Sequence, residues 1–159
     1  MAIYAKFEGA PGESAAKGHE KWIDLQSMSH HIVRTSSHTN AGGSAQGNTT
    51  FGDFSASFLL DSSCPKLAEF CANGANVKTV EIHDTANHDK ADRTYKTIKL
   101  ANVLITSYSE SSSGGASAAR PHISITFSFE KIDVDYKPTK TDGALDGSIP
   151  FKFDVRKKA

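Results

Sequence analysis

The sequence predicts a mainly β protein, an antiparallel barrel or sandwich with one lateral α-helix. Segments with an apolar residue at every second position recur along the chain, as at Ile123, Ile125, Phe127 and Phe129. Such alternation is typical of strands, because successive side chains point to opposite faces. Turn-forming residues separate these segments, and one segment alone has helical signals. Many strands beside a single helix favour a barrel or sandwich.

The first third of the chain combines strands with one long polar segment. Residues 2–8 alternate and end at a Gly-Ala-Pro-Gly turn. Residues 20–34 predict a strand pair, with a change of apolar parity near Ser27 that indicates a bulge or bend. Residues 35–50 are rich in Ser, Gly and Asn, which predicts a loop or a protruding arm. Composition leaves open whether this segment is a disordered loop or a functional one, and residues 51–60 return to a strand.

One helix is predicted between Ser62 or Ser63, either of which can cap it, and Gly74. Pro65 suits its first turn and glycine suits its end. One apolar stripe should face the barrel, plugging its open end or covering its wall. The stripe consists of Leu67, Phe70 and Cys71.

The rest of the chain predicts further strands around two flexible connections. A long strand is expected over 122–135, with a bulge after Phe129 where the apolar positions change parity. A long bent strand of this kind can serve two surfaces at once. Residues 109–120 are rich in Ser, Gly and Ala, which predicts a hairpin loop. Four more strands are expected at 77–84, 94–100, 101–108 and 149–155.

Composition indicates one domain, residues 1–159, without a strong charge preference. Eighteen basic residues balance eighteen acidic ones. No field of this kind would attract nucleic acid or anionic lipid, whereas weak repulsion permits self-association. The first residues lack a basic leader followed by an apolar run, so we expect synthesis in the cytoplasm and no membrane insertion.

The two cysteines, Cys64 and Cys71, fall within one predicted helix. Seven helical residues span about 10 Å, too far for a disulfide between them. We expect small buried or half-buried thiols.

Residue patterns for catalysis, metal binding or cofactor binding are weak. His30 and His31 are adjacent on a predicted strand, so their side chains should point to opposite faces and cannot chelate together. The segment 83–93, with two His-Asp pairs, has the composition of a solvated turn. No nucleophile elbow or phosphate-binding glycine loop is present. We therefore expect no enzyme and no cofactor.

Other polar residues also favour ordinary structural roles. Asp142 and Asp146 lie in a predicted loop and are interpreted as turn-forming aspartates. The basic residues 156–158 have no aromatic residues among them and are interpreted as a solvated terminus. Trp22 is interpreted as a core or interface anchor. These patterns leave binding and assembly as the leading classes. A closed homo-oligomeric ring would cover strand edges that otherwise pair without control.

Five segments, in order along nearly the whole chain, resemble the haemolysin-coregulated protein (Hcp) family. Four are AIYAKFEGAPGES, HEKWIDLQSMS, SSCPKLAEFCANG and LANVLITSYSESSSGG. The fifth is the strand from Ile123 with the loop that follows it, which carries Asp135, Tyr136, Pro138, Asp142, Gly143, Ala144, Asp146 and Gly147.

The resemblance implies a β-barrel that assembles into a hexameric ring. Stacked rings would form the inner tube of the bacterial type VI secretion system, which a contractile sheath surrounds and a spike protein tips. The lumen of the ring can hold effector proteins. The resemblance therefore implies secretion through this system without a signal peptide, and partners that comprise the chain itself, sheath, spike and effectors.

Candidate residues follow for two surfaces of such a ring. A lumen should be polar and lined by small residues, which favours Ser27, Ser29 and His31. The ring faces need weaker polar contacts, and the polar arm and the 139–147 loop are the candidates for them. The stacking candidates are Ser37, His38, Asn40, Gln46, Asp142 and Asp146.

The alternative is a monomeric β-barrel that binds a small ligand in its interior. Such barrels leave part of the interior open. The bulky rows here, which include Phe54, Phe58 and Phe127, look sufficient to fill a small barrel.

Overall fold

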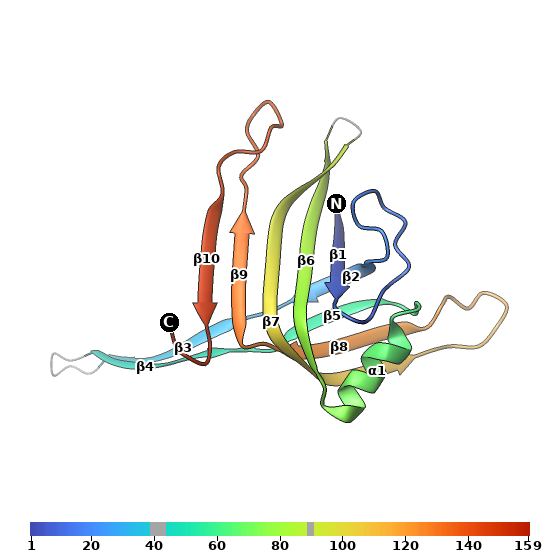
Figure 1. The fold of residues 1–159 in the computed structure, drawn as a ribbon, viewed down its shortest axis with the longest axis horizontal. Coiled ribbons are helices and arrows are strands. Elements are labelled where there is room, and N and C mark those ends of the chain that lie inside the picture. The colour runs from blue at the N-terminus through green and yellow to red at the C-terminus, as the bar shows by residue number, and fades with distance from the viewer. Residues whose placement is uncertain (39–43, 89–90) are drawn as a thin grey trace.

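The computed structural model describes residues 1–38, 44–88 and 91–159. Ten strands and one helix occupy these residues (Figure 1). The strands are β1 (Ala2–Phe7), β2 (Ile23–Ser29), β3 (Ile32–His38), β4 (Ser44–Phe51), β5 (Phe54–Leu59), β6 (Asn76–His88), β7 (Ala91–Ser111), β8 (His122–Ser128), β9 (Lys131–Tyr136) and β10 (Ile149–Asp154), and the helix is α1 (Cys64–Asn73).

Six strands close into an antiparallel barrel in the order β7-β6-β1-β2-β5-β8, because β8 also pairs with β7. The predicted mainly β barrel with one helix is confirmed. The expected strand pair over 20–34 is wrong in detail, since β2 pairs with β1 and β5 and β3 pairs with β4. The bulge expected near Ser27 is present, between Leu25 and Ser27.

The 21-residue strand β7 replaces the two strands expected over 94–108. One of its edges pairs with β6, and the other pairs first with β9 and then with β8. The strand expected over 122–135 is therefore two strands, which break at Phe129 and Glu130 but stay in line along β7. Asn102 has a positive φ of 50° beside this break, and its side-chain amide donates to Glu130 over 2.6 Å.

The strands β9 and β10 extend the sheet beyond the closed barrel, and we call them the flange (Figure 1). β10 pairs with β9 and forms the outer edge of the sheet. The apolar parity change after Phe129 marks the point where the chain leaves the barrel for the flange. The segment thus contributes one strand to the barrel and one to the flange, and the expectation that it serves two surfaces stays a prediction.

The polar segment 35–50 contributes to a β-hairpin, β3–β4, which projects from the barrel as an arm (Figure 1). The loop expectation is wrong for the described part of this segment, and the arm expectation is correct. Antiparallel pairing satisfies the backbone N–H and C=O groups without apolar side chains. Composition alone therefore did not predict that the described part of this segment forms a regular hairpin.

Helix α1 begins after Ser63 and ends at Gly74, as predicted. Gly74 adopts the left-handed conformation at φ 63°, which glycine tolerates without strain. Ser63 makes no capping bond with its side chain. Just before the helix, Asp61 Oδ1 accepts a hydrogen bond from the Ser63 backbone N–H at 2.9 Å. Leu67 is fully buried, and Phe70 and Cys71 pack at the edge of the core.

Large side chains fill the barrel interior. Phe54, Phe58, Phe127, Ile123 and Ile125 are each fully buried. Burying one such side chain contributes about 1.5–3 kcal/mol, and Phe127 also packs edge-on against Phe7 at 5.3 Å. In the part of the chain that the structure describes, no helix is long and apolar enough to cross a membrane.

Candidate assembly surfaces

Two rows of hydroxyl side chains cross four adjacent strands on the outside of the barrel. The register places them on one face, because directly paired residues share a face. All are exposed or partly exposed. We call this surface the hydroxyl face, and it consists of Ser29, Ser55, Thr126 and Ser107 in one row and Ser27, Ser57, Ser124 and Ser109 in the other.

Hydrogen bonds join neighbouring strands across the hydroxyl face. The hydroxyls of Ser27 and Ser57 lie 2.6 Å apart, and those of Ser107 and Thr126 lie 2.7 Å apart. Small hydroxyl side chains carry no charge and expose little apolar surface. The face therefore interacts with water and offers few apolar contacts to a protein.

The structure brings two of the three predicted lumen residues together. Ser27 and Ser29 belong to the hydroxyl face, whereas His31 follows the end of β2 and lies against Gly52. His30 and His31 connect β2 to β3, so the expectation that they lie within a strand is wrong. The His30 ring stacks on Phe54 with centroids 4.5 Å apart. Burial, with smaller effects of Lys96 and His31, lowers the pKa of His30 below its ordinary value.

An exposed apolar strip lies on the flange. Ile149 pairs with Tyr136, and Phe151 stands two residues further along β10 on the same face. These side chains are 58%, 43% and 42% exposed in the order Ile149, Tyr136 and Phe151. We call Tyr136, Ile149 and Phe151 the edge strip. Because β10 is also the outer strand of its sheet, the edge strip combines exposed apolar area with unpaired backbone groups.

Further exposed apolar residues lie at the base of the arm. Ile32 and Val33 on β3 are 45% and 48% exposed. Phe51, at the end of β4, packs against Phe153 of β10 with ring centroids 4.7 Å apart. The base of the arm and the flange are thus joined by aromatic packing. Sequence reasoning assigned neither surface to an interface, although alternation over 149–155 indicated one apolar face.

The predicted stacking residues fall on two separate structures. Ser37 and His38 lie on β3 and Gln46 on β4, whereas Asn40 falls outside the described residues. Asp142 and Asp146 lie in the loop between β9 and β10. Their side chains accept hydrogen bonds from the backbone N–H groups of Ala144 at 3.0 Å and Gly147 at 2.7 Å.

The β9–β10 loop is fixed by contacts with the β6–β7 hairpin. Gly143 has φ +80° and lies against the His88 ring, where a Cβ atom would come within 2.0 Å of it. The Arg93 guanidinium donates to the Gly143 carbonyl over 2.5 Å. Asp142 and Asp146 are therefore exposed on a loop with a defined position.

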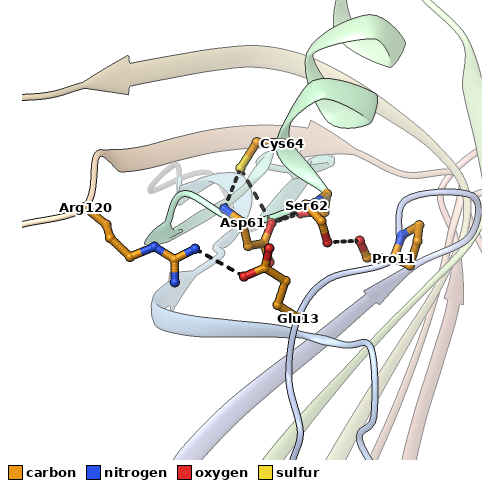
Figure 2. Close-up of polar contacts among 7 residues, drawn as sticks. Pro11, Glu13, Asp61, Ser62, Cys64 and Arg120 are labelled. Atoms are coloured by element: carbon orange, nitrogen blue, oxygen red, sulfur yellow. Dashed lines mark hydrogen bonds and ion pairs between the residues drawn. The ribbon is translucent and has the colours of Figure 1, made fainter.

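The segment that connects β1 to β2, residues 8–22, is the β1–β2 loop. It contacts the start of α1 and the loop between β7 and β8 (Figure 2). The Ser62 hydroxyl donates to the Pro11 carbonyl over 3.2 Å, and Arg120 forms an ion pair with Glu13 at 3.1 Å. Cys64, buried beside Asp61, has its pKa raised by burial. Both cysteines are free, as expected.

A cluster of aromatic and titratable side chains fixes the other end of the β1–β2 loop to the barrel wall. His19 is 7% exposed and stacks on Tyr4 with centroids 4.4 Å apart. Its Nε2 lies 2.8 Å from Nδ1 of His83, whose Nε2 lies 2.8 Å from Glu81 Oε1. Trp22 packs against both imidazoles. No local pattern predicts this cluster, because the chain positions of His19 and His83 are far apart.

Among residues 1–38, 44–88 and 91–159, no three His, Cys, Asp or Glu side chains are arranged to hold a metal ion. The segment 83–93 covers the last residues of β6 and the first residues of β7. Asp89 of this segment lies outside the described residues.

Comparison with known proteins identifies relatives over nearly the whole chain. The family model described as "Type VI secretion system effector, Hcp" matches residues 4–136. Protein hcp1 of Pseudomonas aeruginosa is 30% identical over 155 residues, which cover 97% of this chain and 94% of that protein.

Solved structures share the fold. One described as a type six secretion system protein has a TM-score of 0.90 at 23% identity and covers 99% of this chain and 98% of its own. Hcp1 from Salmonella typhimurium has a TM-score of 0.78 at 18% identity, with 99% and 96% covered. A type VI secretion system effector from Yersinia pestis has a TM-score of 0.71 at 25% identity, with 96% and 98% covered.

Proposed function

The chain belongs to the Hcp family of type VI secretion proteins, and we propose that it is a subunit of the secretion tube. Six copies close into a ring, and rings stack into a tube that carries effector proteins in its lumen. Residues 1–159 act as one domain in this assembly. The protein acts mechanically, with the contractile sheath and the tip spike as partners, and leaves the cytoplasm through the secretion system without a signal peptide.

The observation that carries the proposal is the edge strip. Three large apolar side chains stand exposed on an outer strand, where a neighbouring subunit would cover both the side chains and the strand edge. Long-lived subunit interfaces have an apolar centre of this kind. When each subunit presents two different complementary surfaces, head-to-tail contacts form a ring if the rotation between neighbours closes. The flange supplies one such surface.

The hydroxyl face suits the wall of a lumen. It is polar and uncharged, so it stays hydrated and holds no partner tightly. Ser27 and Ser29 remain our lumen candidates, and His31 is a candidate for the rim. The arm, with Ser37, His38, Asn40 and Gln46, and the β9–β10 loop, with Asp142 and Asp146, remain the candidates for contacts between rings.

The edge strip can be tested by one substitution and a matched control on the same strand. Phe151→Gln removes an apolar side chain from the strip, whereas Lys152→Gln changes the opposite face of β10. We expect the native chain and Lys152→Gln to form particles of six 17.0 kDa subunits, about 102 kDa. Phe151→Gln should dissociate roughly five- to 150-fold more readily, because a central apolar side chain contributes about 1–3 kcal/mol to an interface.

Light scattering across a dilution series measures the mass, and negative-stain images of the same samples show whether particles are annular. A native chain that stays at 17.0 kDa at high concentration would contradict the ring and favour the ligand-binding barrel. Equal dissociation of Phe151→Gln and Lys152→Gln would leave a ring but remove the edge strip from its interface.

A further inference from the structure

The contact between His19 and His83 is unusual because two imidazole nitrogens face each other at 2.8 Å. Such a contact needs one proton between the two rings. If His83 is neutral with its proton on Nε2, it donates to Glu81 and accepts from His19. If His83 carries both protons, it donates to Glu81 and to His19. The pair can therefore bind one added proton without losing a hydrogen bond.

A second added proton has no place in this arrangement. Both facing nitrogens would then carry N–H groups, with two positive charges within hydrogen-bonding distance. The hydrogen bond would be lost, and the charges would repel each other across a partly buried contact. His19 would have to move away from β6 or release the proton.

Some of the groups around His19 favour a positive charge on its ring, and others oppose it. Tyr4 stacks on one side from β1, and Trp22 packs edge-on from the end of the loop, with Lys6 Nζ 6.0 Å from the Trp22 ring. His83 and Glu81 face it from β6. Glu20, Glu81 and Asp92 favour a charge on His19. Burial and His83 outweigh them, so the pKa of His19 is lower than its ordinary value.

Movement of His19 would release more than one side chain. His19 is the buried anchor of the loop's second half, which continues through Lys21, with φ 63°, into Trp22. The first half of the same loop contacts Ser62 at the start of α1 and Arg120 beyond β7 (Figure 2). Loss of the anchor would thus loosen three surface segments together.

We propose that the contact between His19 and His83 is an acid-sensitive latch, which holds the β1–β2 loop on the barrel wall near neutral pH and releases it in mild acid. The latch belongs to one subunit and does not depend on the proposed assembly. The loop opens when the His19–His83 pair takes up its second proton, because the two facing nitrogens then both carry N–H groups. Below pH 6.5, uptake of one proton makes opening about tenfold more favourable for each unit of pH, until the folded protein is itself protonated.

The test combines hydrogen exchange with fluorescence of Trp22, the one tryptophan of the chain. Exchange in residues 8–22, corrected for the intrinsic effect of pH, should accelerate between pH 6.5 and 4.5 in the native chain. Trp22 emission should change over the same range. His19→Gln can still hydrogen-bond to His83 but cannot take up a proton, so it should remove the acceleration of exchange. Trp22 also packs against the His83 ring, so its emission supports the exchange result and does not replace it. His122→Gln, at an exposed histidine on β8, should leave both intact.

Three results would overturn the latch. They are unchanged protection of residues 8–22 down to pH 4.5, persistence of the exchange acceleration in His19→Gln, or loss of this acceleration in His122→Gln. If His19→Gln fails to fold, as judged by circular dichroism, His83→Gln replaces the partner imidazole of the contact and must also remove the acceleration of exchange. Scattering on the same samples separates loop opening from ring dissociation.

Discussion

Asp84 is an acidic residue in a largely buried position. Its side chain is 13% exposed on β6, and Lys96 Nζ lies 3.8 Å from its Oδ2. Within the described residues its other oxygen, Oδ1, has no hydrogen-bond partner. Burial raises the pKa of Asp84 above the ordinary carboxyl value, and Lys96 offsets only part of this effect. The folded protein therefore holds the Asp84 proton more tightly than the unfolded chain does.

We expect Asp84→Asn to stabilise the protein at pH 7 by about 1 kcal/mol, the lower end of the cost of an unsatisfied buried polar group. The sign follows from the pKa. Because the folded-state value is raised, native stability falls as pH rises from the ordinary carboxyl range through the folded pKa. The gain from asparagine should therefore shrink towards pH 4. Urea unfolding of both proteins at pH 7 and at pH 4, at one protein concentration, measures this difference in the free energy of unfolding.

Asp142→Asn is the matched control for Asp84→Asn. Asp142 is exposed, and asparagine keeps the acceptor for the Ala144 N–H. It should change stability little at either pH. An Asp84→Asn variant that is less stable than the native chain at pH 7 would show that the Lys96 ion pair outweighs burial.

At the scale of elements, the arm is separate from the core. The arm pairs through register contacts from Ile32–Phe51 outward to His38–Ser44, with an irregularity between Arg34 and Ser36. Beyond its base, the arm residues whose side chains the structure describes, 34, 35 and 48–50, are all exposed and lie outside the buried core. A two-stranded ribbon has little stability of its own. We therefore expect the arm to gain its order from contacts with neighbouring subunits.

Shortening the arm should separate folding from stacking. A variant with Asn-Gly in place of residues 36–47 joins the strands by a two-residue turn, which suits a hairpin. The melting temperature of the subunit should change by less than about 4 °C, the shift expected for 1 kcal/mol in a domain of this size. Rings should form, but stacked tubes should be lost in electron micrographs. Tubes of normal length would exclude the arm from the contacts between rings.

The sequence predicted elements best where a pattern is local. Alternation and cap residues located β1, β5, α1 and β10 because each signal lies within a few neighbouring residues. The pattern could not show that β7 is one strand, since its bend depends on β8 and β9 along one edge. The contact between His19 and His83 was also missed, because the two residues meet only after β1 and β6 pair.

At the scale of the whole molecule, the barrel separates its surfaces by chemistry. The hydroxyl face covers four barrel strands, while the edge strip lies on the flange beyond β7. With eighteen positive and eighteen negative side chains, the subunit has no net charge to oppose association. Because these surfaces lie on different strands, the proposed roles in ring closure, lumen lining and stacking can be tested separately.

The hydroxyl face provides the sharpest test of subunit orientation. Ser29 is exposed on this face, and Ser29→Asp adds one carboxylate there. If the face lines the centre of a ring of six, the ring would gain six negative charges around its centre. Solvent and salt screen exposed charges over about 8 Å. If the face lines a lumen, rings should therefore keep their mass of about 102 kDa in 0.15 M salt. If the face were instead a subunit interface, burying six unpaired carboxylates would cost several kcal/mol for each contact. The Ser29→Asp variant would then dissociate as Phe151→Gln is expected to do, and light scattering at matched concentrations distinguishes the two orientations.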